Sequence, residues 1–332
     1  METSQYGNFS YSTQNSLDRG FTHRLINYWL EWLSFPVSII NVIGVLANIF
    51  LFSLLVTLRR RQEISDAGLI LLCNEAIVDF QNSLYAIIYT HSDFHILPDF
   101  HGDFEWIREF VCLVWHSQYP YWVTYCVSVF NEVLLSTERY IAISFPFHQD
   151  KFRKRIPFFL FLLYLTQLTF NSPYFFYNEY NFTINDCIAS HFHDDLIFFR
   201  WYSIVWSLEA YLFPAIANLF INGLIIKKLR ITDKILSIHS TQSSNFKNKA
   251  SRMLLKASIT ISVLYVFTMF YTNYFYVTQS HEGIYDSYDI RNIIGIGLAT
   301  FHFSFKPLIV MFFLPAIRRF TFDLLTARRR RQ

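Results

Sequence analysis

Seven stretches of the chain are apolar over most of their length and are separated by polar segments. They cover residues 33–58, 67–90, 110–143, 156–177, 197–226, 253–278 and 292–314. Each is long enough to cross the hydrocarbon core of a bilayer, which is about 30 Å thick and needs about 20 helical residues. The pattern therefore predicts an all-α membrane protein, a bundle of seven transmembrane helices.

The composition agrees with insertion in a membrane. Of the 332 residues, 53% are hydrophobic and only 16% are charged, whereas soluble domains contain about 25% charged residues. A soluble globule would have to cover this apolar surface with very little charge. No internal repeat is visible, which argues against a transporter built from two duplicated halves.

Lysine and arginine are unevenly distributed among the polar segments. With the amino terminus outside, 21 of the 28 basic residues fall in cytoplasmic segments and five in outer segments. Because Lys-rich and Arg-rich loops stay in the cytoplasm, we expect a multi-pass protein with its amino terminus outside. The membrane in which we expect it is the plasma membrane. Glycosylation sequons at Asn8 and Asn181 both fall on that outer side. Residues 1–28 contain no continuous apolar stretch, so we expect no cleavable signal peptide.

The consecutive residues Glu138, Arg139 and Tyr140 carry a carboxylate, a guanidinium and a phenol, and they follow an apolar run that starts at Val123. Charged side chains are costly in hydrocarbon, so the triplet marks where the third helix leaves the membrane. An ordinary ion pair at a helix end is the alternative interpretation of these three residues.

The triplet resembles the Asp/Glu-Arg-Tyr motif of rhodopsin-like (class A) G-protein-coupled receptors. Further resemblances cover residues 33–320 and follow in the family's order. They are Gly44 through Asn48 in the first span, Asp79 in the second, Ser128 in the third, Pro214 in the fifth, and Phe305 through Val310 in the seventh. The resemblance implies an outer tail over 1–28, a receptor domain over 29–320 that ends in a short eighth helix, and a basic cytoplasmic tail over 321–332.

The resemblance also assigns roles to individual residues. Glu138, Arg139 and Tyr140 would form the switch that engages a heterotrimeric G protein. Cys112, at the start of the third span, and Cys187, in the following outer loop, would form the family's disulfide, as two thiols facing an oxidising compartment should. Two unpaired outer thiols are the alternative. Cys112 is two residues further from Arg139 than is usual in the family, which a local bulge or a longer helix would absorb.

A set of polar residues is predicted to lie inside the bundle. The set comprises Asn48, Glu75, Asp79, Ser128, Glu132, His302, Lys306 and Pro307. Many family members hold a sodium ion beside the second-helix aspartate, and Lys306 is placed to put an ammonium there instead. The pair Asp79–Lys306 would either rearrange on activation or act as a fixed link between helices two and seven.

Several family features are missing, and they indicate a divergent member of the invertebrate type, similar to peptide receptors. The sixth span lacks the Cys-Trp-x-Pro hinge, Asn222 replaces the fifth-helix tyrosine, and Val310 replaces the seventh-helix tyrosine. The residue six positions before Lys306, Thr300, stands where opsins carry the retinal lysine. Lys306 is therefore too deep for an opsin, by about 9 Å along the helix.

The outer segments carry fifteen acidic residues against five basic ones, and many aromatic residues. Carboxylates and aromatic faces suit a cationic ligand. Because Tyr121 occupies the position of the amine-binding aspartate, we expect an Arg- or Lys-bearing neuropeptide rather than a small amine. The expected ligand-binding residues are Trp115, Tyr121, Trp122, Trp201, Tyr202, Tyr271 and Tyr274. An interfacial aromatic belt with solvated acidic loops is the alternative.

Other classes of function stay open at this point. They are a chemosensory receptor for a small molecule, a transporter or channel that uses the intramembrane charges, and a non-signalling scaffold. No enzymatic constellation is visible, the eleven histidines show no metal-ligand spacing, and no cofactor or nucleic-acid partner is expected. The expected partners are an extracellular ligand, a heterotrimeric G protein and the lipid bilayer.

Overall fold

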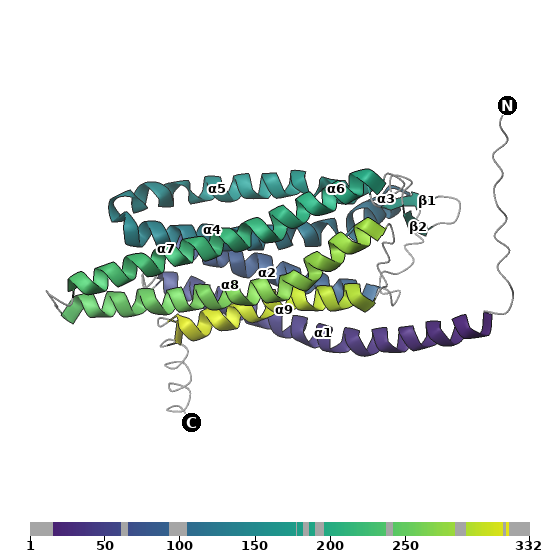
Figure 1. Cartoon of the computed structure of the whole chain (residues 1–332), viewed down its shortest axis with the longest axis horizontal. Coiled ribbons are helices and arrows are strands. Elements are labelled where there is room, and N and C mark those ends of the chain that lie inside the picture. The colour runs from purple at the N-terminus through teal and green to yellow at the C-terminus, as the bar shows by residue number, and fades with distance from the viewer. Residues whose placement is uncertain are drawn as a thin grey trace, which may run out of the picture.

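The computed structural model describes residues 16–60, 66–92, 105–176, 178–181, 186–189, 196–236, 242–282, 290–314 and 317–318. The long helices lie side by side along one direction (Figure 1). Their bounds are α1 Ser16–Arg60, α2 Asp66–Ser92, α4 Tyr119–Ser144, α5 Gln149–Phe170, α6 Leu196–Ser207, α7 Phe213–Leu236, α8 Gln242–Glu282 and α9 Ile290–Phe313. The π turn η6, Leu208–Leu212, joins α6 to α7, so these three elements form one span. The prediction of an all-α bundle of seven spanning helices is confirmed.

Short elements connect the long helices at the two ends of the bundle. They are α3 Glu105–Val111, the π turn η2 Cys112–His116, and the 3-10 helices η3 Pro146–His148 and η4 Ser172–Phe176. A hairpin of β1 Asn178–Asn181 and β2 Asp186–Ala189 pairs antiparallel, with Tyr180 opposite Cys187. Figure 1 shows this hairpin at one end of the bundle, and the end of α7 and the start of α8 at the other.

Four segments are long and apolar enough to cross a membrane by length and composition: Trp32–Arg59, Arg200–Ile231, Leu255–Gln279 and Ile294–Phe313. Helices α2, α4 and α5 are less apolar. Helix α2 contains Glu75 and Asp79, α4 contains Glu132, and α5 begins with a basic turn. The side chains of Glu75, Asp79 and Glu132 are buried inside the bundle, so they do not meet lipid.

The third span differs from the single helix predicted over residues 110–143. The chain breaks at Gln118, whose φ of 57° is left-handed, and α4 starts one residue later. Pro120 lies in the first turn of α4, where its missing N–H is tolerated, but it could not lie inside a continuous helix without removing a hydrogen bond. The π turn and the break together accommodate the longer spacing from Cys112 to Arg139.

The buried side chains form three layers along the bundle. An aromatic cluster, which includes Trp122, Tyr125, Trp206 and Phe303, fills the half that is nearer the hairpin. An aliphatic cluster of mostly leucine and isoleucine fills the other half. Along α2, α4 and α9 alike, polar residues separate the two clusters. We call this middle level the polar layer; its ionisable members are Glu75, Asp79, Glu132, His302 and Lys306.

Part of the predicted eighth helix falls within the described residues. Helix α9 ends at Phe313, and helical backbone recurs at Ile317 and Arg318, where the Arg318 N–H donates to the Leu314 carbonyl at 3.0 Å. Ile317 is fully buried against the aliphatic cluster. The remainder of the predicted helix lies outside the described residues.

Candidate functional site

Lys306 is the centre of the polar layer. Its Nζ donates hydrogen bonds to Glu75 Oε1, to Ser128 Oγ at 2.7 Å and to Glu132 Oε1 at 2.8 Å. The same nitrogen lies 3.1 Å from Asp79 Oδ2. Only 2% of the lysine is exposed. A single ammonium group therefore contacts three carboxylates from two other helices.

Local helix geometry explains how these groups converge. Glu75 and Asp79 are four residues apart on α2, Ser128 and Glu132 on α4, and His302 and Lys306 on α9. Residues at this spacing share one face of a helix. Each helix therefore presents two polar groups, one turn apart, at the same level of the bundle.

Each carboxylate of the layer has a second partner. Ser128 Oγ donates to Asp79 Oδ1 at 2.6 Å. Asn131 Nδ2 donates to Glu75 Oε2. His302 Nε2 and Glu132 Oε1 are 2.8 Å apart. Buried charges are stable only when paired and hydrogen-bonded, and these contacts meet that condition.

Small side chains allow the helices around the layer to approach closely. A Cβ at Gly44 of α1 would lie 2.7 Å from Ser83 Oγ on α2 and 2.8 Å from Ser304 Cβ on α9. A larger residue at this position would push the three helices apart. Asn48, predicted for the polar core, is buried one turn further along α1, and its amide donates to the Gly44 carbonyl rather than to the lysine. Pro307 is buried inside α9, next to Lys306.

The polar layer can hold one positive charge against several negative ones, and Lys306 supplies that charge. Among the described residues, no group of three or more His, Cys, Asp or Glu side chains is arranged to hold a metal ion. Chemically, the arrangement is a buried ion-pair network that links α2, α4 and α9.

The aromatic cluster lies directly against this layer. Trp122 contacts Trp206 edge to face, with ring centroids 5.1 Å apart, and Trp206 contacts Tyr276 at 5.0 Å. Tyr125 meets Phe303 at 5.6 Å, and the Lys306 ammonium lies 5.4 Å from the centre of the Phe303 ring. Phe303 therefore touches both the aromatic cluster and the polar layer.

Three of the predicted ligand-binding residues lie in this cluster. Tyr121, Trp122 and Tyr202 are buried, and their rings pack on other aromatic side chains. The Tyr121 hydroxyl and the Trp122 Nε1 have no hydrogen-bond partner among the described residues. Unpaired buried donors are unusual in proteins, and these two belong to residues that the sequence predicts to bind the ligand.

Two predicted ligand-binding residues lie elsewhere. Trp201 is 66% exposed and Tyr274 is 62% exposed. Each belongs to a stripe of exposed residues at helical spacing, so both face away from the bundle. Tyr271 is half-buried and stacks on Phe275. The side chain of Trp115 lies outside the described residues.

The carboxyl end of α4 carries the predicted switch residues. Glu138 is buried, lies within electrostatic range of Arg139, and is hydrogen-bonded to Gln149 at the start of α5. Tyr140 packs edge to face on Phe145. One turn before Arg139, the hydroxyls of Ser136 on α4 and Ser258 on α8 are 3.3 Å apart. The ends of the third and sixth spans are therefore joined beside the switch.

Residues 47–314 match the family described as "7 transmembrane receptor (rhodopsin family)". The chain belongs to this family. It is a multi-pass membrane receptor, and the family as a whole works with extracellular ligands and G proteins. No curated protein matches the chain.

The receptor's cysteines fall into two groups. Cys73 and Cys126, inside the bundle, are free, whereas Cys112 is disulfide-bonded. Strand β1 lies against the π turn that contains Cys112. Asn181 ends β1, on the hairpin, and Asn8 lies outside the described residues.

Sequence reasoning missed several members of the receptor's aromatic cluster. Tyr125 and Trp206 are completely buried at its centre. A signal was present, because Trp206 is four residues after Tyr202 and Tyr125 is three residues after Trp122, which places each pair on one helical face. The sequence therefore offered a reason to place the helical face of Trp206, rather than the face of Trp201, toward the inside of the bundle.

Proposed function

We propose that the receptor binds an extracellular ligand against the aromatic cluster and activates a heterotrimeric G protein through Glu138, Arg139 and Tyr140. One observation carries this proposal: Phe303 contacts the aromatic cluster on one side and Lys306 on the other. A ligand that displaces an aromatic ring would press on the ion-pair network. Glu132 of that network lies on α4, six residues before Glu138.

Lys306 takes the place of the sodium ion in this proposal. Its ammonium already lies among the carboxylates that would otherwise attract a cation. Activation would change the contacts of Lys306 with Asp79 and Glu132 and so alter the packing of α9 against α2 and α4. The competing version, in which the network is a fixed link, predicts the same resting contacts and no change on activation.

The proposed ligand is a neuropeptide that bears Arg or Lys. Support comes from the excess of acidic over basic residues in the outer segments, which would attract a cationic ligand. A peptide backbone also offers carbonyl acceptors for the unpaired donors of Tyr121 and Trp122. This proposal includes a plasma-membrane location, an outer amino terminus, glycosylation at Asn8 and Asn181, and a Cys112–Cys187 bridge.

A small-molecule chemosensory receptor is the second candidate. The rings of Trp122, Trp206 and Tyr276 are in direct contact, and such a compact cluster suits a small acceptor-bearing molecule as well as one peptide side chain. Transport is less consistent with the network, because its one lysine is held by three carboxylates.

The deciding experiment is a ligand screen with a second-messenger readout in cells that express the receptor. A neuropeptide library and a small-molecule library should be tested in parallel, and Arg139→Ala should serve as the signalling-dead control. We expect a basic peptide to give a response that Arg139→Ala removes while surface expression is retained. A response that survives Arg139→Ala, or ligand-driven ion flux without G-protein activation, would contradict the proposal.

A further inference from the structure

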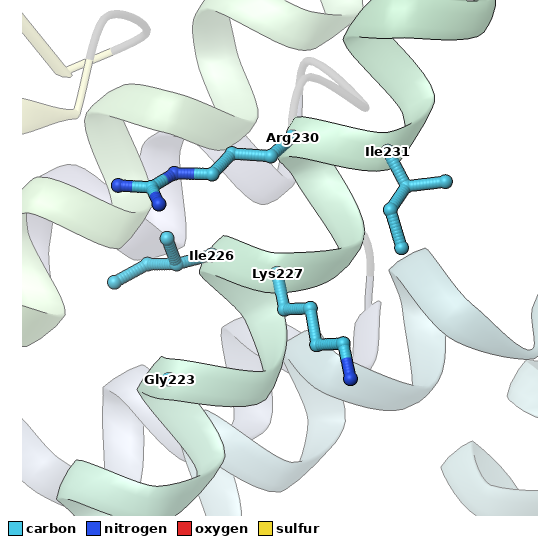
Figure 2. A pocket seen from close by; sticks show the side chains of 5 residues that line it. All are labelled: Gly223, Ile226, Lys227, Arg230 and Ile231. Atoms are coloured by element: carbon cyan, nitrogen blue, oxygen red, sulfur yellow. The ribbon is translucent and has the colours of Figure 1, made fainter.

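A hollow of about 330 Å³ lies on the surface of α7 near its carboxyl end. It is lined by Gly223, Ile226, Lys227, Arg230 and Ile231 (Figure 2). We call it the α7 groove. Figure 2 shows Ile226 and Arg230 extending to one side of the helix and Lys227 and Ile231 to the other. Each side of the groove therefore consists of one isoleucine and one cation, four residues apart.

Gly223 forms the membrane end of the α7 groove. A Cβ added there would have no atom within 4 Å, so the glycine is not required by packing between helices. It leaves a gap in a stripe of exposed apolar side chains that includes Ile216, Leu219 and Phe220. Exposed apolar residues at this helical spacing face lipid in a membrane protein, so the groove opens toward acyl chains.

The cationic end of the α7 groove has no counter-charge of its own. Lys227 and Arg230 are both exposed, and among the described residues neither has a carboxylate partner. They lie about 6 Å and about 10 Å beyond Gly223 along the helix axis. From Gly223 toward the carboxyl end of α7, the groove therefore offers an apolar gap first and two cations next.

We propose that the α7 groove binds an acidic phospholipid of the cytoplasmic leaflet. Its acyl chain would lie over Gly223 and between the isoleucines. Its phosphate would lie over the turn that carries Lys227, a point charge, and Arg230, whose planar guanidinium can form bidentate contacts with phosphate oxygens. Both side chains would turn toward the phosphate from the two sides of the helix seen in Figure 2. Basic hollows at the cytoplasmic ends of spanning helices suit anionic headgroups. The site rests on membrane insertion and on the outer amino terminus of the proposed function, and it does not depend on which ligand or G protein the receptor uses.

The position and the lining of the α7 groove favour a lipid over a soluble protein as its occupant. A helix from a cytoplasmic partner would approach from the end of the bundle, whereas this hollow lies on the side that faces lipid. Its lining is three apolar residues and two cations, which matches the amphipathic character of a phospholipid.

The test measures binding of fluorescent phosphatidylserine and fluorescent phosphatidylcholine to the purified full-length receptor in detergent. Gly223→Leu should fill the groove without a clash, and Lys227→Gln with Arg230→Gln should remove the headgroup contacts. Near a membrane surface each basic residue contributes about fivefold, so we expect the double variant to lose roughly 30-fold in phosphatidylserine affinity. Lys151→Gln with Lys154→Gln, two exposed lysines on α5, is the charge-matched control and should retain binding.

Several results would overturn the proposal. They are equal binding of the two lipids, no loss in either groove variant, an equal loss in the α5 control, or displacement of the lipid by inorganic phosphate alone. A loss of G-protein activation with unchanged lipid binding would assign the groove to a protein partner instead. Unchanged thermal unfolding of the double variant guards against misfolding as the cause of lost binding.

Discussion

The Lys306 ammonium nitrogen lies 3.1 Å from Asp79 Oδ2, and the two residues are 227 positions apart in the chain. The distance means that the seventh span of the receptor supplies, from its own side chain, the positive charge that faces the second-span aspartate. Glu75 and Glu132 contact the same nitrogen.

Replacing Lys306 by Met should destabilise the receptor strongly. The substitution leaves Glu75, Asp79 and Glu132 buried without their shared cation, and breaking a buried ion pair from one side costs about 3–5 kcal/mol. Thermal unfolding of the purified protein measures this loss. Lys256→Met, which removes an exposed lysine from α8, should have little effect, and similar losses in both variants would show that the network adds no stability.

Replacing Lys306 by Asn should create sodium sensitivity. The shorter neutral side chain vacates the space between Asp79 and Glu132, and a small cation can then take the place of the ammonium. We expect sodium chloride to raise the unfolding temperature of the variant above that in N-methylglucamine chloride. The unmodified receptor should respond equally to the two salts. Strong sodium dependence in the unmodified receptor would mean that Lys306 does not fill the cation position.

Replacing Ser258 by Ala should raise basal signalling. The Ser136–Ser258 contact holds α8 against α4 beside Arg139, and a hydrogen bond of this kind contributes about 0.5–1.5 kcal/mol. Losing it should increase about 2- to 10-fold the population of receptors in which α8 has moved away from α4. Second-messenger level without ligand is the readout. Thr260→Ala is the matched control, since that exposed hydroxyl bonds only within α8, and an equal rise there would rule out a specific α4–α8 lock.

Replacing Trp122 by Phe should weaken the response to ligand. The change keeps an aromatic ring against Trp206 but removes the buried Nε1 donor, which has no partner among the described side chains. If the ligand accepts a hydrogen bond there, its potency should fall about 2- to 10-fold. Trp201→Phe, on the exposed face of α6, should leave the dose–response curve in place. A shift of the dose–response curve with Trp201→Phe alone would mean that the ligand binds at the exposed face of α6.

Replacing Cys187 by Ser should reduce surface expression and ligand binding. A disulfide of this kind contributes about 2–4 kcal/mol, and the change would leave Cys112 without its proposed partner. Flow cytometry of an epitope-tagged receptor gives the surface level. Cys73→Ser, which alters a free cysteine, should reach the surface normally. Normal surface level and binding of Cys187→Ser would mean that Cys112 is bridged elsewhere or that the bridge is dispensable.

The sequence by itself determined the membrane class, the seven spans and the identity of the polar-layer residues. Runs of apolar residues indicate membrane-spanning helices because the thickness of the bilayer fixes the length of such a helix. Pairs at a spacing of four residues, such as Glu75 with Asp79 and His302 with Lys306, report on a shared helical face because that spacing is one turn. Both signals are local, so a single sequence was enough to read them.

Only the tertiary structure decided which faces meet one another. Trp201 and Trp206 lie five residues apart on α6, yet one faces outward and the other is fully buried. The sequence could not separate them, because a membrane helix is apolar toward lipid and toward its neighbours alike. The sharing of Lys306 among three carboxylates and the contact of Glu132 with His302 also depend on how three helices pack. Pairing between residues so distant in the chain is set by that packing, which no local pattern records.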